Sequence, residues 1–354
     1  MYGLETFLAE NVKLILKENV LALISDKGLA TVSSAVFNGG FRQVKAVLNI
    51  GVPQGYSDIS LHLDPMKLIT ASASKLEITK DYLAMVTAAN VNNYSLFTKK
   101  SDDFMVSVAA TAGCSHGESS GEEMDVSEIV GTINIIVLIE GNPTDSCMVA
   151  ALITATEAKS AVLRDFDIRS RYTGDSATGT ITDSVTVAST QSGKAFSLAG
   201  PASKLGKIVG YCARHAVTEA LLKQEPIWGC RTVLDRLRER HLPLDKLVLE
   251  LSKVEDLVID AQTLEEILKK NPFASASLLA AAKLDDDYKK NLLLPVEFGD
   301  VNELSKCFGV CTQSEVDYSI LPNYSRVDLS PFLKQALINI VRQTQFDYKL
   351  KRLK

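Results

Sequence analysis

The stretch Gly131-Thr-Ile-Asn-Ile-Ile-Val-Leu-Ile139, together with the run Ser146–Arg164 that follows it, decides the fold. The first segment is apolar at both odd and even positions, which is typical of a strand covered on both faces. Thr144 or Asp145 can then act as a helix N-cap. Ser146 to Arg164 is apolar or small nearly all round, which predicts a buried helix. A doubly covered strand followed by a buried helix favours an α/β protein.

Strand and helix patterns alternate outward from this stretch as far as residue 223. Leu14–Val36 is expected to hold two short strands around a turn at Asp26-Lys27-Gly28. A helix is expected after Pro65, because proline is favoured in the first helical turn. We expect further strands over Tyr82–Ala89, Phe104–Thr111 and Thr180–Ser189, and a long helix over Ser203–Lys223.

The chain changes character after residue 224, where Pro226 and Trp228 interrupt the alternating pattern. A length of 354 residues suggests about two domains. We therefore expect a layered sheet-and-helix domain over residues 1–224 and a smaller, mostly helical domain of unknown role over residues 225–354. The expected helices of the second domain cover Cys230–Arg240, Thr263–Lys270 and Ala274–Leu293.

Composition narrows the classes of function. Hydrophobic residues make up 46% and charged residues 23%, as in globular proteins. A net charge of -5 argues against a nucleic-acid-binding protein, and the basic run at residues 349–354 is typical of a solvated tail. The longest strongly apolar run, residues 133–139, is far shorter than a membrane span, and residues 1–13 lack the apolar core of a leader. We expect a cytoplasmic protein with no membrane or nucleic-acid partner, and homo-oligomerisation stays open.

Cysteine and histidine spacing gives little support for a metal site. The six cysteines are scattered and lie mostly in apolar surroundings, which is typical of buried thiols. Cys307 and Cys311 form an isolated C-x3-C without the second pair that a structural zinc site needs. The loop with Cys114, His116 and Glu118 is more typical of a solvated segment than of a chelate. No cofactor or metal site is expected, although the sequence leaves open whether the activity requires a metal.

Two charged residues interrupt the buried helix. Glu157 and Lys159 point about 200° apart around its axis, so they cannot pair with each other and each needs its own partner. A buried charge without a partner costs several kcal/mol or shifts its pKa. Such surroundings suit a general acid or base. The alternative is an ordinary ion pair from each residue to another element.

A second unusual segment runs from Ala177 to Val187. If it is a strand, Thr180 and Thr182 share one face while Asp183 falls on the apolar face, an unfavourable place for a carboxylate without a partner or a chemical role. The sequence of this segment also places Thr178 and Gly179 where a hydroxyl and a closely approaching backbone can contact a ligand. The alternative is a strand rich in threonine for its strand propensity alone.

Two further sites carry polar groups that could contact a ligand. Asn38-Gly39-Gly40 is a turn by composition, and it can also present the Asn38 side chain and backbone amides. Asn134 lies inside the apolar strand and must find hydrogen bonds, either structural or to a substrate. The sequence lacks the Gly-x-Ser-x-Gly, P-loop and Rossmann motifs, so none of those chemistries is expected.

These segments together resemble the adenosylcobinamide amidohydrolases of corrinoid salvage. The order and spacing of the matching stretches cover about residues 20–223. The run Thr154-Ala-Thr-Glu-Ala-Lys159, followed by Ala177-Thr-Gly-Thr180 and Thr182-Asp183, is the most specific part. The other matching stretches are Asn38–Gly40, Met85–Ala89, Thr111–Gly113, Gly131–Asn134 and Ser203–Gly206.

The resemblance implies hydrolysis of the aminopropanol amide of adenosylcobinamide, giving adenosylcobyric acid and 1-aminopropan-2-ol for cobalamin assembly, a salvage route typical of archaea and some bacteria. Our hypothesis makes Glu157 the base, Thr180 the nucleophile or oxyanion contact, Asp183 its orienter and Lys159 a charge stabiliser or the partner of the leaving amine. A non-catalytic corrinoid carrier and an amidase for another substrate are the alternatives. The residues expected to contact the substrate are Asn38, Gly39, Gly40, Asn134, Thr178, Gly179 and Thr182.

Overall fold

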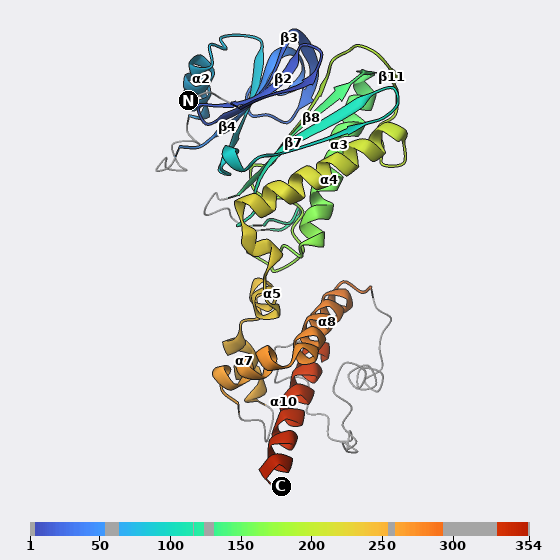
Figure 1. The fold of residues 1–354 in the computed structure, drawn as a ribbon. Coiled ribbons are helices and arrows are strands. Elements are labelled where there is room, and N and C mark those ends of the chain that lie inside the picture. Colours follow the sequence, from blue (N-terminus) through green and yellow to red (C-terminus); the bar gives the residue numbers. More distant parts are fainter. Residues whose placement is uncertain are drawn as a thin grey trace. The chain divides into compact units, whose positions relative to one another are not determined.

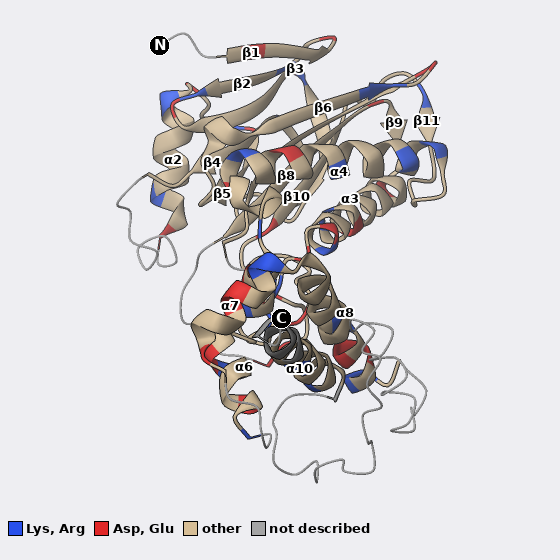
Figure 2. Ribbon diagram, turned by 60° about the horizontal axis from the view of Figure 1, so that its bottom comes forward, with Lys and Arg blue, Asp and Glu red and all other residues tan. Residues whose placement is uncertain are grey.

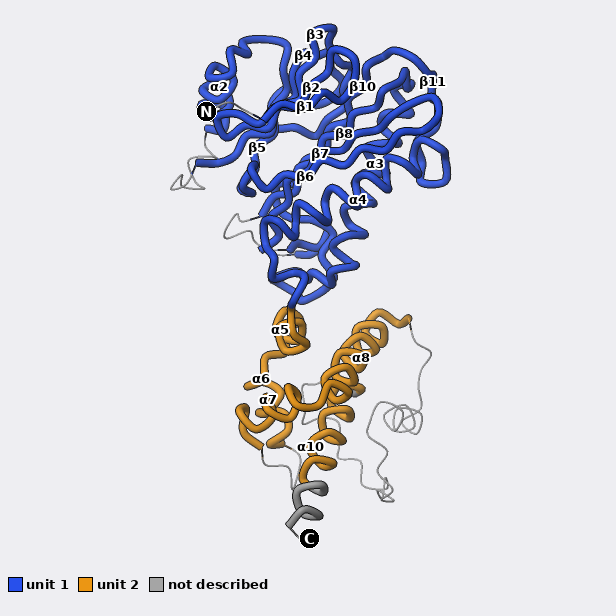
Figure 3. The backbone as a smooth tube through the Cα atoms, in the orientation of Figure 1, with its two compact units in different colours: residues 1–230 blue, residues 231–354 orange. Residues whose placement is uncertain are grey.

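The computed structural model describes residues 4–53, 64–115, 117–123, 131–253, 259–292 and 331–352. It divides into two compact units, Met1–Cys230 and Arg231–Lys354 (Figure 3). The predicted boundary after residue 224 falls near the end of the first unit. Unit 1 is a mixed α/β domain and the described part of unit 2 is helical, which confirms the predicted fold class.

Nine of the described strands of unit 1 form one curled sheet (Figure 1). Its main path runs β1-β2-β3-β10-β8-β7-β6, while β4 pairs with β3 and β5. β10 is parallel to β8 and β4 is parallel to β5. Two short strands, β9 (Asn142–Pro143) and β11 (Ala195–Phe196), pair separately. The nine strands are β1 (Leu4–Ala9), β2 (Val12–Lys17), β3 (Val20–Ser33), β4 (Gly40–Gly51), β5 (Tyr82–Thr87), β6 (Ser95–Lys100), β7 (Met105–Gly113), β8 (Thr132–Glu140) and β10 (Ser184–Ser189).

The curl produces layers around β8, whose residues are buried on both faces as its sequence predicts. Ile133, Ile135 and Val137 pack against the two long helices α3 (Asp145–Asp165) and α4 (Lys204–Gln224), which are green and yellow in Figure 1. Ile136 and Leu138 face a second core formed with β2, β3, β4 and β5. Helix α2 (Pro65–Lys75) covers the far side of β4 and β5.

Local chemistry explains where the helices begin. Thr144 caps α3 by accepting the Cys147 N–H, and Ser203 caps α4 by accepting the Gly206 N–H. The predicted helices after Pro65, from Ser146 and from Ser203 are confirmed within one or two residues. Two 3-10 turns, η1 (Val91–Asn93) and η2 (Pro226–Gly229), complete the described helical elements of unit 1.

Two strand predictions need correction. The segment Asp26–Gly28 is not a turn between strands: it lies in an irregularity within the long strand β3, and the chain reverses direction at Glu18 and Asn19 instead. This irregularity lets the first half of β3 pair with β2 and its last residues pair with β10. The other error concerns Thr180–Asp183, which forms a turn before β10 rather than part of the strand.

Helix α3 is long and apolar enough to cross a membrane by length and composition, and half of the qualifying stretch is buried inside the structure. It packs against β10 and α4. A core helix of a folded domain passes the same test, and the packing assigns α3 to that role. Among the residues that the structure describes, no second helix meets these criteria.

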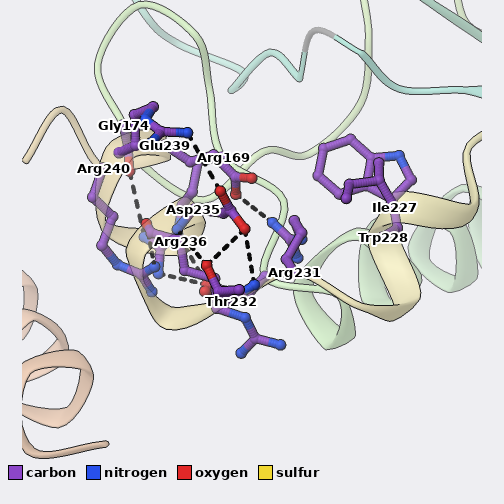
Figure 4. A network of polar contacts seen from close by, with 12 residues as sticks. Arg169, Gly174, Ile227, Trp228, Arg231, Thr232, Asp235, Arg236, Glu239 and Arg240 are labelled. Carbon is purple, nitrogen blue, oxygen red and sulfur yellow. Dashed lines mark hydrogen bonds and ion pairs between the residues drawn. The ribbon is translucent and has the colours of Figure 1, made fainter. Parts of the chain in front are cut away.

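The described part of unit 2 consists of helices around its own apolar cluster. A capping box between Thr232 and Asp235 begins α5, and the buried Arg231 side chain pairs with Glu239 (Figure 4). The predicted helices over 230–240, 263–270 and 274–293 are confirmed with shifted ends. The bounds are α5 (Val233–Glu239), α6 (Leu244–Leu251), α7 (Ala261–Lys270), α8 (Pro272–Lys289) and α10 (Pro331–Arg352).

Candidate functional site

The structure brings together three of the four residues predicted to be catalytic. Lys159 from α3 reaches the turn before β10 and forms an ion pair with Asp183. The Thr180 hydroxyl donates to the other oxygen of the same carboxylate, with 2.5 Å between Thr180 Oγ1 and Asp183 Oδ1. We call Lys159, Thr180 and Asp183 the Thr/Asp/Lys cluster. Side-chain exposure is 8% for Lys159 and 11% for Asp183, so water screens their interaction only weakly.

Asp183 is held by four donors. Besides Lys159 and the Thr180 hydroxyl, its carboxylate accepts the backbone N–H of Thr180 at 3.0 Å and that of Ile133, at the start of β8, at 2.9 Å. The bonds to Thr180 close a tight Asp-stabilised turn, which competes with a strand and explains why β10 begins at Ser184 rather than at Thr180. The predicted placement of Asp183 on an apolar strand face is therefore wrong, while its need for partners is met.

Gly179 permits the close packing of this cluster. A Cβ atom at this position would lie 2.6 Å from Asp183 Oδ2 and 2.8 Å from Lys159 Nζ. Its backbone is also fixed from the other side, because its carbonyl accepts the Glu118 N–H at 2.9 Å. The glycine is therefore required by the ion pair beside it, and the segment 177–183 is held between α3 and the loop around Glu118.

A group of polar side chains lies beside the Thr/Asp/Lys cluster, where β5 and β7 end and β8 and β10 begin. We call this end of the sheet the polar edge. The Asn134 amide donates to Asn49 Oδ1 at 2.8 Å and to the Val86 carbonyl at 3.0 Å, and the Asn49 amide donates to Thr111 Oγ1 at 2.9 Å. All three of these polar side chains are buried. The prediction that Asn134 must find hydrogen bonds is confirmed for its amide N–H groups, whose partners lie on β4 and β5, while its buried Oδ1 accepts none from the described residues.

Thr182 lies at the same edge, where it is exposed. Its hydroxyl lies 2.7 Å from that of Thr132, and the Thr132 hydroxyl also accepts the Ala88 N–H at 3.5 Å. The family-like stretches around residues 87, 111, 132 and 182 thus meet where β5 and β7 end and where β8 and β10 begin. Parallel and antiparallel pairing places these four strand ends together.

Glu157 does not join the Thr/Asp/Lys cluster. It is exposed, contrary to the prediction of a buried carboxylate, and it lines a groove of 820 Å³ between α3 and α4. Thr178 lines the same groove, and its carbonyl accepts the Ser160 hydroxyl at 2.8 Å. The sequence failed to place Glu157 because the apolar pattern surrounds the whole helix, while the structure leaves one strip of α3 uncovered.

Asn38, Gly39 and Gly40 lie apart from the polar edge. The Asn38 amide donates to the Tyr82 carbonyl at the start of β5, whereas the polar edge adjoins the end of that strand. A Cβ atom at Gly39 would lie 2.5 Å from the Ala35 carbonyl oxygen, and Gly40 has φ +80°. These contacts explain the two glycines as a tight turn.

The described residues contain no group of three or more His, Cys, Asp or Glu side chains placed to hold a metal ion. Glu122, in the loop considered as a chelate, instead accepts the Ser170 and Thr173 hydroxyls. Cys114, Cys147 and Cys212 are buried free thiols as predicted, and burial raises the pKa of Cys212 to about 11. Cys230 is exposed, while Cys307 and Cys311 lie outside the described residues.

Sequence reasoning missed Asn49 as a member of the site, and it did not single out Thr111 or Thr132. Asn49 follows the apolar pattern of β4 without a turn or motif to mark it. Its partner Asn134 is 85 residues away. A polar residue at an otherwise buried position of β4 is the one signal that could have identified Asn49.

Comparison with known proteins identifies the family to which the chain is similar. The family model described as adenosylcobinamide amidohydrolase matches residues 6–228, more than half of the chain. An uncharacterized protein of Methanocaldococcus jannaschii is 31% identical over 210 residues, covering 53% of this chain and 81% of that protein. A protein of Methanosarcina mazei named adenosylcobinamide amidohydrolase is 29% identical over 204 residues, covering 56% of this chain and 88% of that protein.

Solved structures give a more distant likeness. The crystal structure of the PH0078 protein from Pyrococcus horikoshii aligns with 58% of this chain and 77% of that chain. The TM-score is 0.34 and the sequence identity is 11%. The family match covers unit 1 up to residue 228 and leaves unit 2 outside it.

Proposed function

The chain belongs to the adenosylcobinamide amidohydrolase family, and on that premise we propose that it hydrolyses the aminopropanol amide of adenosylcobinamide. The products are adenosylcobyric acid and 1-aminopropan-2-ol. The proposed role is salvage of a cobalamin precursor in the cytoplasm. The observation that carries the chemistry is the Thr/Asp/Lys cluster, in which a half-buried hydroxyl, a carboxylate and an ammonium group are in direct contact.

In the proposed mechanism the Thr180 oxygen attacks the carbonyl carbon of the scissile amide while its proton passes to Asp183. Because Asp183 already accepts that hydroxyl, the proton acceptor needs no rearrangement. Lys159 gives a proton to the leaving amine as the C–N bond breaks, and the proton on Asp183 then restores Lys159. A water molecule finally hydrolyses the ester on Thr180, releasing the acid and the free hydroxyl.

Two kinds of partner of Asp183 are needed in this scheme, the Lys159 ammonium group and the backbone N–H groups. The Lys159 ammonium compensates the negative charge of the buried carboxylate, and the two backbone N–H groups fix its orientation. The hypothesis that Glu157 is the base stays a prediction, and it requires the substrate carbonyl to approach the α3/α4 groove. A Glu157→Gln variant with unchanged turnover would remove Glu157 from the chemistry.

The test is incubation of the purified protein with adenosylcobinamide, followed by mass spectrometry of both products. Release of adenosylcobyric acid and 1-aminopropan-2-ol in equal amounts is the expected result. Binding of the corrinoid without either product would indicate that the protein is a corrinoid carrier and not an enzyme. Neither binding nor products would point to an amidase with another substrate. A parallel sample with a chelator measures metal dependence.

A further inference from the structure

We propose that the groove between α3 and α4 binds the corrin ring of the substrate, an inference that rests on the proposed function. The groove lies within unit 1 and has a volume of 820 Å³. Pockets for drug-sized ligands span roughly 300–1,000 Å³, so this one is near the upper end of that range. A small amide would not require such a volume, whereas a macrocycle would.

The floor of the groove is built for close approach of a flat ligand. Ala158 and Ala161 on α3 and Gly206 and Gly210 on α4 line it, so no long side chain rises between the two helices. At Gly210 an added Cβ would lie in ordinary contact with Thr154, 3.5 Å away, so helix packing alone does not demand a glycine there. Gly206 is required by its close approach to the Gly200 carbonyl, with which an added Cβ would clash, whereas the lack of a side chain at Gly210 keeps the groove open.

Each of the two helices that form the walls of the groove contributes polar side chains. Lys207, Tyr211 and Arg214 follow one another on α4 at spacings of four and three residues, which places them along one face. On α3, Glu157 and Arg164 share a face by the same rule. Figure 2 shows both basic and acidic residues on each of the two helices, and positions 157–165 contain most of those on α3.

Several of these groups are available to a ligand. The Arg214 side chain is paired with Asp165, but the side chains of Arg164, Lys207 and Glu157 form no hydrogen bond or ion pair with any residue that the structure describes. The periphery of a corrin ring carries several amide side chains, each with an N–H donor and a carbonyl acceptor. Arg164 and Lys207 can donate to the carbonyl groups, and Glu157 can accept from the N–H groups.

The groove is close enough to the Thr/Asp/Lys cluster to serve one substrate. Thr178 lines the groove, and Thr180 follows two residues later in the same segment. Two residues of extended chain span at most about 7 Å. A ring held in the groove can thus extend the arm with the scissile amide around this segment toward the Thr180 hydroxyl. In this arrangement Glu157 contacts the ring rather than the reacting carbonyl.

The test separates ring binding from hydrolysis by using the product as the probe. Adenosylcobyric acid keeps the ring but lacks the scissile amide, so equilibrium dialysis measures its Kd without turnover. We expect Ala161→Trp, which fills the groove, to raise this Kd by about tenfold or more. Ile153→Trp is the matched control, because it places the same side chain on an exposed face of α3 outside the groove lining. Its Kd should stay within about twofold of the wild type.

A second variant guards against misfolding. If thermal unfolding shows that Ala161→Trp does not fold, the exposed pair Arg164→Ala with Lys207→Ala should raise the same Kd by about threefold or more. An unchanged Kd in a folded groove variant would overturn the ring site. If the wild type nevertheless hydrolyses adenosylcobinamide, the proposed function stands. If the wild type binds adenosylcobyric acid in the groove but forms no product from adenosylcobinamide, the hydrolase proposal fails and the ring site stands.

Discussion

Each unit contains a carboxylate that is largely shielded from solvent, and the two are held in different ways. Asp183 in unit 1 accepts from an ammonium group, a hydroxyl and two backbone N–H groups. Asp285 in unit 2 is 3% exposed and accepts the N–H groups of Phe332 and Leu333 at 3.1 and 2.9 Å, in the first turn of α10. Burial raises the pKa of Asp285 to about 6.

The difference separates a carboxylate with a paired cation from one that only caps a helix. Lys159 compensates the charge of Asp183, and the same carboxylate accepts the Thr180 hydroxyl, which places it to take part in proton transfer. Asp285 instead satisfies the free N–H groups of a helix start and is favoured there by the helix dipole. Its surroundings disfavour the charged form, so its contribution to stability depends on pH between 3.8 and about 6.

Removing the Lys159 cation from Asp183 should have the largest effect on the free energy of unfolding. Lys159→Met leaves Asp183 buried without a counter-ion, and we expect a loss of about 3–5 kcal/mol in the free energy of unfolding. Urea unfolding measures it. Adding Asp183→Asn should recover part of the loss, because the uncompensated charge is then gone. The control is Lys204→Met, which breaks an exposed pair with Asp103 and should leave the free energy of unfolding nearly unchanged, because solvent screens that pair. Equal losses in the two single variants would contradict the distinction.

The second carboxylate, Asp285, should make the free energy of unfolding depend on pH. Since the folded-state pKa of about 6 lies above the model value of 3.8, the folded state binds more protons than the unfolded state between those values. Asp285 therefore makes the free energy of unfolding fall as pH rises through this window. At one pKa unit per about 1.4 kcal/mol, the fall is at most roughly 3 kcal/mol.

Asp285→Asn should remove this fall, because its side chain does not titrate. Unfolding in urea, followed by circular dichroism from pH 4 to pH 8, compares the variant with the wild type. The exposed Asp245→Asn should keep the wild-type profile. If the wild type and Asp285→Asn have parallel profiles over this range, the burial argument for Asp285 is wrong.

A smaller effect should follow from crowding the first carboxylate. Gly179→Ala forces the contacts of 2.6 and 2.8 Å with Asp183 and Lys159 to open. We expect a loss of about 1–3 kcal/mol in the free energy of unfolding, together with slower turnover. Gly200→Ala is the control, since nothing lies within 4 Å of the added Cβ and its backbone is not left-handed. A neutral Gly179→Ala would show that the ion pair does not need this close packing.

Periodic burial made the central architecture predictable. β8, α3 and α4 follow from apolar patterns and caps that a single segment contains, and their bounds agree closely with the expectation. Asp183 was predicted to lie in a strand but lies in a turn, because its side chain accepts hydrogen bonds from Thr180 that compete with strand formation. A pattern of alternating residues does not reveal this local competition.

The candidate site was predictable only in part, because its partners are distant in sequence. Lys159 and Asp183 are 24 residues apart, and the sequence marked both as unusual without showing that they meet. The bond between Asn49 and Asn134 depends on the curl of the sheet, a tertiary feature that neither strand specifies. Glu157 was wrongly predicted to be buried, because a helix with an apolar pattern all round can still have a strip exposed to solvent.

The turnover of adenosylcobinamide by Thr180→Val tests whether the Thr180 hydroxyl is the nucleophile. Valine keeps the shape of threonine but removes the hydroxyl that Asp183 accepts. We expect the wild type to release 1-aminopropan-2-ol, kcat to fall by about a thousandfold or more in Thr180→Val, and Thr98→Val to retain activity. Thr98 is a fair control because its hydroxyl is also bonded, to Ser107 on a neighbouring strand. Turnover by a folded Thr180→Val protein at the wild-type rate would show that the Thr180 hydroxyl is not the nucleophile.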